Sequence, residues 1–480
     1  MLIWIALLGL VLFSATAYVA GRRKVLSAAG GSSRLLHSLP GYHGAYLALW
    51  AAAPAIILLL LVSLFGAQLE EAVLRGDPPA AVASLPDSTQ DVFYNDVVAT
   101  ATGGQVSQTA YDGALGEAFA DKLALAYDIH RNLVIGALAG AFVLALAGAA
   151  MAWPRLSADF AARPRVERWI AVLFLACSVV AVLTTLGIVA SLVWESWRFF
   201  QAVPVFEFLF GLTWDPQIAI RADQVASSGA FGAVPLFMGT FLIMMIAMTV
   251  AAPVGLFAAI YLSEYAGPTV RAVVKPLLEI LAGIPTVVYG FFAALTVGPL
   301  FRGAFNSLGA QFIGGPLDGL GLYLMQVQNQ MALVAGAVMG IMLIPFVSSL
   351  SDDIINAVPQ SLRDGSLAMG ATRSETISRV IMPAALPGVM GALLLAISRA
   401  VGETMIVTMA AGLQARATFN PLDTVTTVTV QIVTLLTGDQ EFDSPKTLSA
   451  FGLGLTLFLI TLMLNIVALR IVQRYREQYD

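Results

Sequence analysis

Arg399 and Glu403 stand four residues apart in an otherwise apolar stretch, Ser398–Met405. A charge at mid-membrane depth costs about 2.5–3.5 kcal/mol, so such a charge usually has a function. The spacing predicts that both side chains lie on one face of a helix, in an order that is poor for simple stability. A guanidinium stays charged and binds an oxyanion through two parallel hydrogen bonds. The residues alone leave two roles open, a contact for an anion in transit and a structural ion pair between helices.

The composition indicates an all-α polytopic membrane protein. Of the 480 residues, 58% are hydrophobic and only 11% are charged, and the mean hydropathy is +0.83. A soluble domain is about one quarter charged. Apolar stretches predict about nine transmembrane helices, at 2–20, 44–66, 132–153, 169–194, 235–262, 274–300, 330–350, 386–412 and 450–472.

The charges of the connecting segments predict the orientation. Segments 21–43 and 154–168 and the C-terminal tail are rich in Arg and Lys, whereas segment 67–131 is acidic. Basic segments stay in the cytoplasm, so we expect the N-terminus outside and the C-terminus inside. The first span has basic residues only after it, at Arg22–Lys24, which favours an uncleaved anchor over a cleaved signal peptide.

Other kinds of site have little support. Cys177 is the only cysteine, which excludes an intramolecular disulfide, and His37, His43 and His130 are scattered without metal-ligand spacing. We expect these histidines to be solvated or interfacial, and we expect no metal site and no catalytic residue. The chain contains no Gly-x-x-x-x-Gly-Lys-Ser/Thr segment for binding ATP.

The chain divides near residue 168. Residues 1–168 contain three spans and one polar outer loop, 67–131, in which we see no aromatic cluster and expect a small lid or partly disordered loop. Residues 169–480 contain the other six spans. Gly336 and Gly340 have the spacing of closely packed membrane helices.

The sixth span contains a predicted break, in the segment Leu281–Gly290. Pro285 removes a backbone donor, and Gly283 loosens the same helix. Broken helices in membranes survive where they line a cavity or are shielded by protein. Glu279, Gly283, Pro285 and Thr286 are therefore candidates for a pore-lining gate, with a structural kink as the alternative.

The segment after the seventh span, about 351–384, predicts two short helices against the inner face of the membrane. Pro359 precedes the first helix, with Ser361 as its cap, and Gly370 ends it. Thr372 and Glu375 form a capping box for the second helix, which we expect to end at Pro383 and Pro387 before the next span. An ordinary interfacial loop is the alternative.

This segment resembles the coupling motif of bacterial ABC importer permeases. The motif is Glu-Ala-Ala, then a Gly, then Ile-x-Leu-Pro. Its positions are filled here, with the spacing intact, by Asp364, Gly365, Ser366, Gly370, Val380, Met382 and Pro383. Together with Leu278–Gly290 and Arg399–Met405, residues 169–480 resemble the type I ABC importer permease core. Within it they resemble the PstC family of phosphate importer permeases, in a long form whose N-terminal extension is residues 1–168.

The resemblance implies a transmembrane permease subunit rather than an enzyme, in the bacterial inner membrane. Arg399, Glu403 and Thr404 would line the phosphate pathway, and the coupling segment would dock the ATPase. Implied partners are a PstA-like second permease, two copies of a PstB-like ATPase and a periplasmic PstS-like phosphate-binding protein. No cofactor is expected in this chain, because the partner uses the ATP.

Three points stay open at the level of sequence. Glu403 could hold Arg399 until phosphate displaces it, or could be protonated and share a hydrogen bond with protonated phosphate. The substrate could instead be another oxyanion, such as molybdate or sulfate. A secondary transporter driven by an ion gradient is the alternative from another class.

Overall fold

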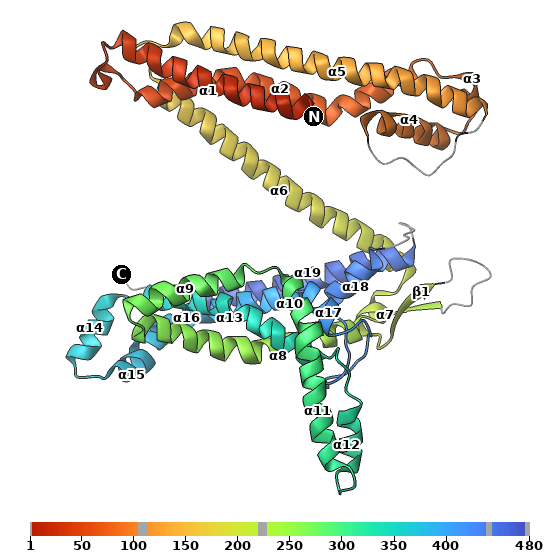
Figure 1. Ribbon diagram of the computed structural model, residues 1–480, viewed down its shortest axis with the longest axis vertical. Coiled ribbons are helices and arrows are strands. Elements are labelled where there is room, and N and C mark those ends of the chain that lie inside the picture. The colour runs from red at the N-terminus through yellow and green to blue at the C-terminus, as the bar shows by residue number, and fades with distance from the viewer. Residues whose placement is uncertain (1, 104–110, 112, 219–227, 438–443, 476–480) are drawn as a thin grey trace. The chain divides into compact units, whose positions relative to one another are not determined.

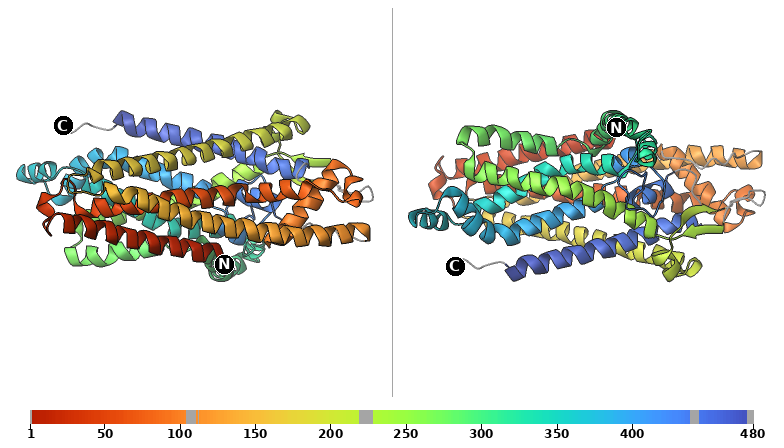
Figure 2. Two further views of the ribbon diagram at one scale, coloured as in Figure 1. Left: turned by 90° about the horizontal axis from the view of Figure 1, so that it is seen from above. Right: turned by 90° about the horizontal axis from the view of Figure 1, so that it is seen from below.

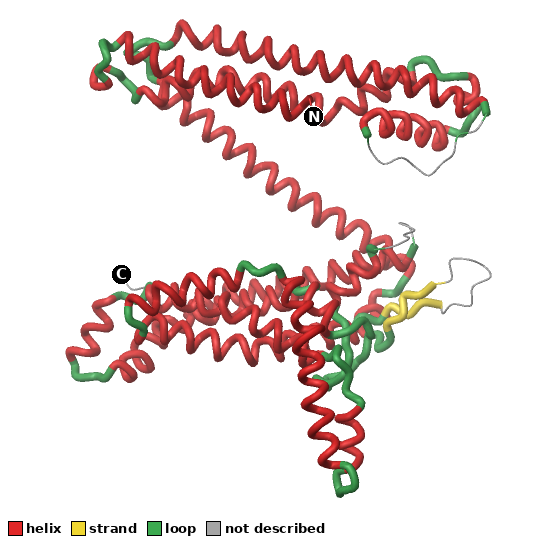
Figure 3. The backbone as a smooth tube through the Cα atoms, in the orientation of Figure 1, coloured by secondary structure: helices red, strands yellow, loops and turns green. Residues whose placement is uncertain are grey.

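The protein consists of two compact units, Met1–Leu183 and Thr184–Asp480 (Figure 1). The computed structural model describes residues 2–103, 111, 113–218, 228–437 and 444–475. These residues are mostly helical, and the strands among them form one hairpin (Figure 3).

The N-terminal unit is a helical bundle. Its elements are α1 (Leu2–Ala28), the 3₁₀ turn η1 (Ser33–Leu35), α2 (Pro40–Arg75), α3 (Ala80–Ala83), α4 (Asp87–Thr102), α5 (Ala114–Ala152), the 3₁₀ turn η2 (Trp153–Arg155) and the first part of α6 (Ala162–Ala202). Helices α1, α2 and α5 run side by side (Figures 1 and 2). Gly148 of α5 permits this packing, because a Cβ there would collide with the carbonyl oxygen of Trp50 on α2.

The expectation of a lid or partly disordered loop at 67–131 is wrong for the residues that the structure describes there. Helices α2 and α5 extend well into this segment, and α4 packs against both. Phe93 and Tyr94 are fully buried, and Phe93 makes edge-on contacts with Tyr111 and Phe119. The segment thus contains the aromatic cluster that the sequence analysis missed, because its members are spread over 27 positions. Residues 104–110 and 112 lie outside the described part.

The C-terminal unit is a larger bundle with a small hairpin. Its helices after α6 are α7 (Val205–Phe210), α8 (Val234–Ile260), α9 (Pro268–Ala282), α10 (Thr286–Phe292), α11 (Gly298–Phe312), α12 (Asp318–Met325), α13 (Ala332–Asn356), α14 (Gln360–Ala368), α15 (Arg373–Thr376), α16 (Met382–Val401), α17 (Met405–Ala410), α18 (Val428–Leu435) and α19 (Pro445–Tyr475). Three π-helical turns, η3 (Tyr261–Tyr265), η4 (Ala293–Val297) and η5 (Ile377–Ile381), adjoin α8, α10 and α16. Strands β1 (Trp214–Ile218) and β2 (Ser228–Phe231) pair antiparallel, with Trp214 opposite Phe231.

Helix α13 is the centre of this unit. Its residues Val334, Ala335, Leu343 and Val347 are fully buried in the largest hydrophobic core. It packs along α8, where a Cβ on Gly336 or Gly340 would lie only 2.6–2.8 Å from Ile246 or Val250. The prediction of close helix packing at these two glycines is therefore confirmed.

Eight helices in the described part are long and apolar enough to cross a membrane. They lie at Pro40–Arg75, Ala114–Arg155, Ala162–Ala202, Val234–Tyr265, Thr286–Phe312, Ala332–Asn356, Arg373–Val401 and Pro445–Ile471. The first predicted span, 2–20, lies within α1, which is not one of these eight, so its crossing of the membrane stays a prediction. Two predicted spans have the wrong bounds. Span 274–300 is split between α9 and α10, and span 386–412 ends early, at Val401.

Candidate functional site

Arg399 lies near the C-terminal end of α16 and lines a cavity. The cavity has a volume of about 660 Å³ and is formed by α13, α16 and α19. The Arg399 side chain is exposed. Its Nη2 lies 4.0 Å from Met342 Sδ, and its Cζ lies 5.5 Å from the centre of the Phe346 ring. The other residues around the cavity are mostly apolar and include Leu350, Ile354, Ala392, Leu395, Ala468 and Leu469.

Glu403 does not share a helix face with Arg399, so this part of the sequence prediction is wrong. Helix α16 ends at Val401, with Gly402 as its C-cap. Glu403 is 9% exposed, and its Oε1 accepts hydrogen bonds from the backbone nitrogens of Met405 at 3.1 Å and Ile406 at 3.3 Å. A carboxylate is stabilised beside the unpaired N–H groups at the start of a helix. The break in the predicted span therefore follows from Glu403 starting the short helix α17.

The arrangement leaves the Arg399 charge without an acidic partner among the described residues. Its recorded side-chain contacts are with sulfur and an aromatic ring, whereas the Glu403 carboxylate is engaged at α17. The backbone of Glu403 is held as well, since Thr429 Oγ1 donates to its carbonyl oxygen at 2.9 Å. Thr404 is the N-cap of α17, and its carbonyl oxygen accepts from Thr408 Oγ1.

The predicted break in the sixth span is present. Gly283 caps the end of α9, Pro285 precedes α10, and Thr286 is its first residue. The membrane-length helix therefore runs from Thr286 to Phe312, and α9 is a separate amphipathic helix on which Glu279 is exposed. Tyr289 Oη donates to the carbonyl oxygen of Leu281 at 3.0 Å, which ties the two sides of the break together.

A cluster of charges that the sequence analysis missed joins α9 to α13. Asp352 is 1% exposed, and its carboxylate accepts hydrogen bonds from Arg271 Nη2 at 3.0–3.1 Å and Lys275 Nζ at 2.9 Å. Lys275 also lies 3.0 Å from Asp353 Oδ1. Hydrogen bonds to Asp352 and Asp353 raise the pKa of Lys275 above its ordinary value. These ion pairs connect residues about 80 positions apart, so no short-range spacing in the sequence predicts them.

Helix α14 ends at Ala368, and Gly370 breaks the chain direction two residues later, as the sequence predicts. Gly370 has a φ of +90°, a region in which a residue with a Cβ is strained. The nitrogens of Gly370 and Ala371 donate to the carbonyl oxygens of Leu367 and Ser366, which is the Schellman arrangement. At the other end the prediction of a Ser361 cap is wrong, because α14 begins after Pro359 with no side-chain cap.

The second short helix begins as predicted but does not end as predicted. Thr372 and Glu375 form the capping box, with Thr372 Oγ1 accepting from the Glu375 nitrogen and Glu375 Oε2 accepting from the Thr372 nitrogen. Helix α15 then continues through η5 into α16, and these elements form one membrane-length helix, Arg373–Val401. Pro383 and Pro387 do not stop it. Pro383 lies just after the π-helical turn, and Pro387 lies inside α16.

The residues of the coupling motif are exposed or half-buried. Asp364 and Gly365 are exposed on α14, beside Leu367 and Met369, whose side chains are 46% and 88% exposed. Ser366 Oγ lies 2.9 Å from Thr376 Oγ1, so α14 is joined to α15. Val380 and Met382 are half-buried, and Pro383 is exposed.

One ion pair links α14 to the end of α8. Arg363 Nη2 lies 3.2 Å from Glu264 Oε1 in η3, with both side chains 14% exposed, and it also donates to the Ile355 carbonyl oxygen at 2.6 Å. Helix α14 is therefore held by α8, α13 and α15, and it projects at one end of the bundle (Figure 1).

Metal-binding clusters of three or more His, Cys, Asp or Glu side chains do not occur among the described residues. The expectation of solvated or interfacial histidines is wrong for His43, which is fully buried. His130 Nδ1 lies 2.8 Å from Glu70 Oε1.

Two family models match the chain. Residues 7–184 match one described as "Phosphate ATP-binding cassette transporter". Residues 251–477 match one described as "Binding-protein-dependent transport system inner membrane component".

Three curated relatives each match between 51% and 60% of the chain. A probable ABC transporter permease protein, YqgH of Bacillus subtilis, is 34% identical over 264 residues, which are 55% of this chain and 76% of that protein. The phosphate transport system permease protein PstC of Mesorhizobium japonicum is 30% identical over 298 residues, 60% of this chain and 84% of that protein. PstC 1 of Mycobacterium tuberculosis is 34% identical over 258 residues, 51% and 73% of the two chains.

Proposed function

We propose that this chain, a multi-pass membrane protein that belongs to the PstC family of phosphate transport system permeases, forms half of the phosphate pathway of an ATP-driven importer. The observation that carries the proposal is the Arg399 guanidinium, which lines a cavity of about 660 Å³ without an acidic partner among the described residues. A permanently charged group in a membrane-spanning helix needs a counter-charge. A passing phosphate ion supplies that charge and matches the planar fork of the guanidinium.

The surroundings of Arg399 favour transient binding. The apolar walls lower the local dielectric and strengthen the attraction to an anion. The contacts with Phe346 and Met342 hold the guanidinium without neutralising its charge. A single cationic contact attracts the ion without enclosing it, and a pathway has to release its substrate as well as bind it.

Glu403 and Thr404 contribute to the pathway by starting α17. Two backbone N–H groups hold the buried Glu403 carboxylate at the start of α17. The carboxylate therefore does not compete with phosphate for the Arg399 guanidinium. Thr404 follows at the N-cap and is half-buried. In this proposal both residues fix the turn between α16 and α17, so that Arg399 stays available to phosphate.

The break between α9 and α10 serves as the moving part of the gate. Gly283 and Pro285 separate the two helices at a point where few backbone hydrogen bonds must break. Thr286 begins the spanning helix, and Glu279 lies on the exposed side of α9. Because Arg271 and Lys275 bind Asp352, α9 moves together with α13.

Helix α14 docks the ATPase. Its surface presents the acidic side chain of Asp364 and the exposed apolar side chains of Leu367 and Met369. Gly365 is exposed between them. The ion pair between Arg363 and Glu264 then connects the docked helix to α8. Movement of α14 is transmitted through this contact and through the bond between Ser366 and Thr376.

The complete importer contains further subunits. ABC importer permeases work with an ATPase and a substrate-binding protein. For this chain we propose a PstA-like second permease, two PstB-like ATPase subunits and a periplasmic PstS-like protein. The ATPase subunits use the ATP, and no cofactor belongs to this chain. We place the chain in the bacterial inner membrane, with its N-terminus in the periplasm and its C-terminus in the cytoplasm.

The proposal is tested by oxyanion competition in proteoliposomes that contain the assembled importer. We expect uptake of labelled phosphate to require the ATPase subunits and internal ATP, and to be reduced by unlabelled phosphate but not by equal concentrations of molybdate or sulfate. Stronger competition by molybdate or sulfate would assign the chain to another oxyanion. Uptake without the ATPase subunits would indicate a transporter driven by an ion gradient.

A further inference from the structure

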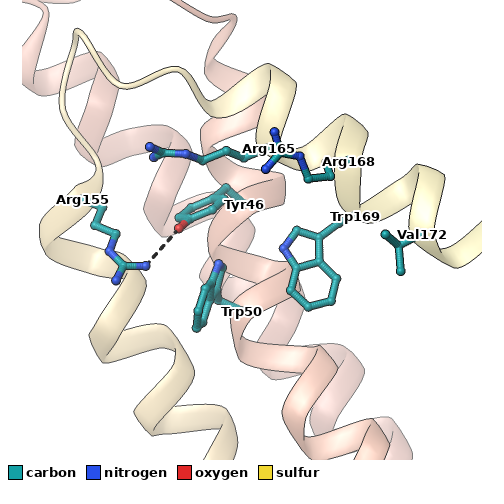
Figure 4. Close-up of a pocket in the computed structure, with 7 residues that line it drawn as sticks. All are labelled: Tyr46, Trp50, Arg155, Arg165, Arg168, Trp169 and Val172. Carbon is teal, nitrogen blue, oxygen red and sulfur yellow. Dashed lines mark hydrogen bonds between the residues drawn. The ribbon is translucent and has the colours of Figure 1, made fainter.

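The N-terminal unit contains a basic, aromatic pocket that the transport proposal does not use. The pocket has a volume of about 550 Å³ and lies where α2 and α6 begin, next to η2. Its lining residues are Tyr46, Trp50, Arg155, Arg165, Arg168, Trp169 and Val172. In the view of Figure 4, Tyr46 lies between the side chains of Arg155 and Arg165, and the rings of Trp50 and Trp169 lie below Arg165 and Arg168.

The three arginines have no acidic partner among the described residues. Arg155 Nη1 donates to Tyr46 Oη at 3.4 Å, and its Cζ lies 5.4 Å from the centre of the Trp50 ring. Arg165 lies over the ring of Phe160 at 4.2 Å. Nearby Glu167 pairs with Arg163, which does not line the pocket. Three guanidinium groups around one opening repel one another unless an anion lies between them.

The wall of the pocket also contains an unused hydrogen-bond donor. Trp50 Nε1 is buried and has no hydrogen-bond partner in the described part of the protein. A buried donor without a partner costs about 1–3 kcal/mol, so an acceptor at this position stabilises the site. Guanidinium and indole N–H groups are all donors, and together they suit a group that presents several acceptor oxygens.

The position of the pocket indicates which kind of molecule supplies the acceptor oxygens. It lies at the ends of membrane-length helices, and tryptophan, tyrosine and arginine are typical of the headgroup level. Directly beyond Trp169 and Val172, α6 exposes Leu173, Phe174 and Leu175, whose side chains are 59–68% exposed. A lipid whose phosphate binds in the pocket can thus place its acyl chains along this apolar surface of α6. An inorganic ion would make no use of that surface.

We propose that this pocket binds the phosphate group of an anionic phospholipid, with the headgroup between the three arginines and the acyl chains against α6. The excess of positive charge favours an anionic headgroup over a zwitterionic one. This site is independent of the phosphate pathway at Arg399, so either proposal can fail without the other.

The test measures lipid retention on the full-length chain by native mass spectrometry, in micelles that contain equal amounts of phosphatidylglycerol and phosphatidylcholine. The wild-type chain should retain phosphatidylglycerol in preference. In the triple variant Arg155→Gln, Arg165→Gln, Arg168→Gln, the ratio of retained phosphatidylglycerol to retained phosphatidylcholine should fall by at least about tenfold. Each basic residue near the surface contributes about 1 kcal/mol to the binding of an anionic lipid. The same three positions changed to Lys should lose only part of it, because Lys retains the charge but not the planar fork.

A matched control removes three exposed arginines from the other basic segments, by Arg22→Gln, Arg470→Gln and Arg474→Gln. This variant should keep the preference. An equal loss in control and pocket variants would mean nonspecific charge attraction, and it would overturn the site.

A second measurement needs only the wild-type chain and covers the case in which the pocket variant fails to insert. Brominated phosphatidylglycerol should quench tryptophan fluorescence more strongly than brominated phosphatidylcholine, since Trp50 and Trp169 line the pocket. Equal quenching by the two lipids would overturn the proposal. Binding of inorganic phosphate to the wild-type chain, without any preference for phosphatidylglycerol, would instead assign the pocket to the free ion and overturn the lipid site.

Discussion

Glu403 Oε1 lies 3.1 Å from the backbone nitrogen of Met405, so the carboxylate caps α17 and is not an ion-pair partner of Arg399. Both residues belong to one short sequence, yet the turn at Gly402 gives them different tasks. Arg399 keeps an accessible charge beside the cavity, and Glu403 fixes the backbone that follows. The structure therefore gives Arg399 and Glu403 different roles, although their spacing in the sequence predicts that they act as one pair.

Substitutions at Glu403 should distinguish the capping role from a role of its charge. Glu403→Gln keeps an oxygen that can accept from Met405 and Ile406, so we expect little change in stability and a modest reduction in uptake. Glu403→Ala removes the acceptor and should destabilise the protein by about 1 kcal/mol, the net contribution of a typical hydrogen bond. Thermal unfolding in detergent and uptake in proteoliposomes measure the two effects. If Glu403→Gln abolished uptake while the protein stayed folded, its charge would be required in the pathway itself.

Gly370 should be sensitive to any residue with a branched Cβ. Gly370→Val forces valine to a φ of +90° and should open the Schellman turn that fixes α14 relative to α15. We expect ATP hydrolysis by the assembled complex to continue, with phosphate uptake per ATP reduced several-fold. The matched control is Gly303→Val on α11, where a Cβ meets no atom within 4 Å. Unchanged coupling in Gly370→Val would remove α14 from the route of transmission.

The local features of this fold could be predicted from the sequence, and the long-range ones could not. The Thr372–Glu375 capping box and the Gly370 break depend on neighbours within a few residues, so their spacing is sufficient. The end of α16 was missed, because hydropathy treats 386–412 as one apolar run and does not register that Glu403 can cap a new helix. The Asp352 cluster joins residues from two helices, and nothing near Asp352 in the sequence identifies Arg271 as its partner.

Lys275 should stabilise the protein evenly across the neutral pH range. Its hydrogen bonds to Asp352 and Asp353 raise its pKa in the folded state above the ordinary value of 10.5. A raised pKa contributes stability that is complete below the ordinary pKa and is lost as the pH rises through the higher, folded-state value. Lys275→Met should therefore lower stability by about 1–2 kcal/mol, with the same difference from wild type between about pH 6 and about pH 9.

Thermal unfolding of wild type and Lys275→Met over this pH range measures that difference. Arg302→Met serves as the control, because Arg302 is exposed on α11. A difference that shrinks between the two pH values would show that a group with a lower pKa, and not Lys275, dominates the cluster.

The central claim is that the Arg399 guanidinium contacts phosphate during transport. The most direct measurement is uptake of labelled phosphate by proteoliposomes that contain the assembled importer with Arg399→Gln, compared with wild type and with the control Arg34→Gln, an exposed arginine outside the membrane-length helices. A hydrogen bond to a charged group contributes about 1.5–3 kcal/mol, so the account predicts a fall of about tenfold to a hundredfold for Arg399→Gln and normal uptake for the control. An Arg399→Gln importer that assembles fully and transports phosphate at the wild-type rate would contradict the account.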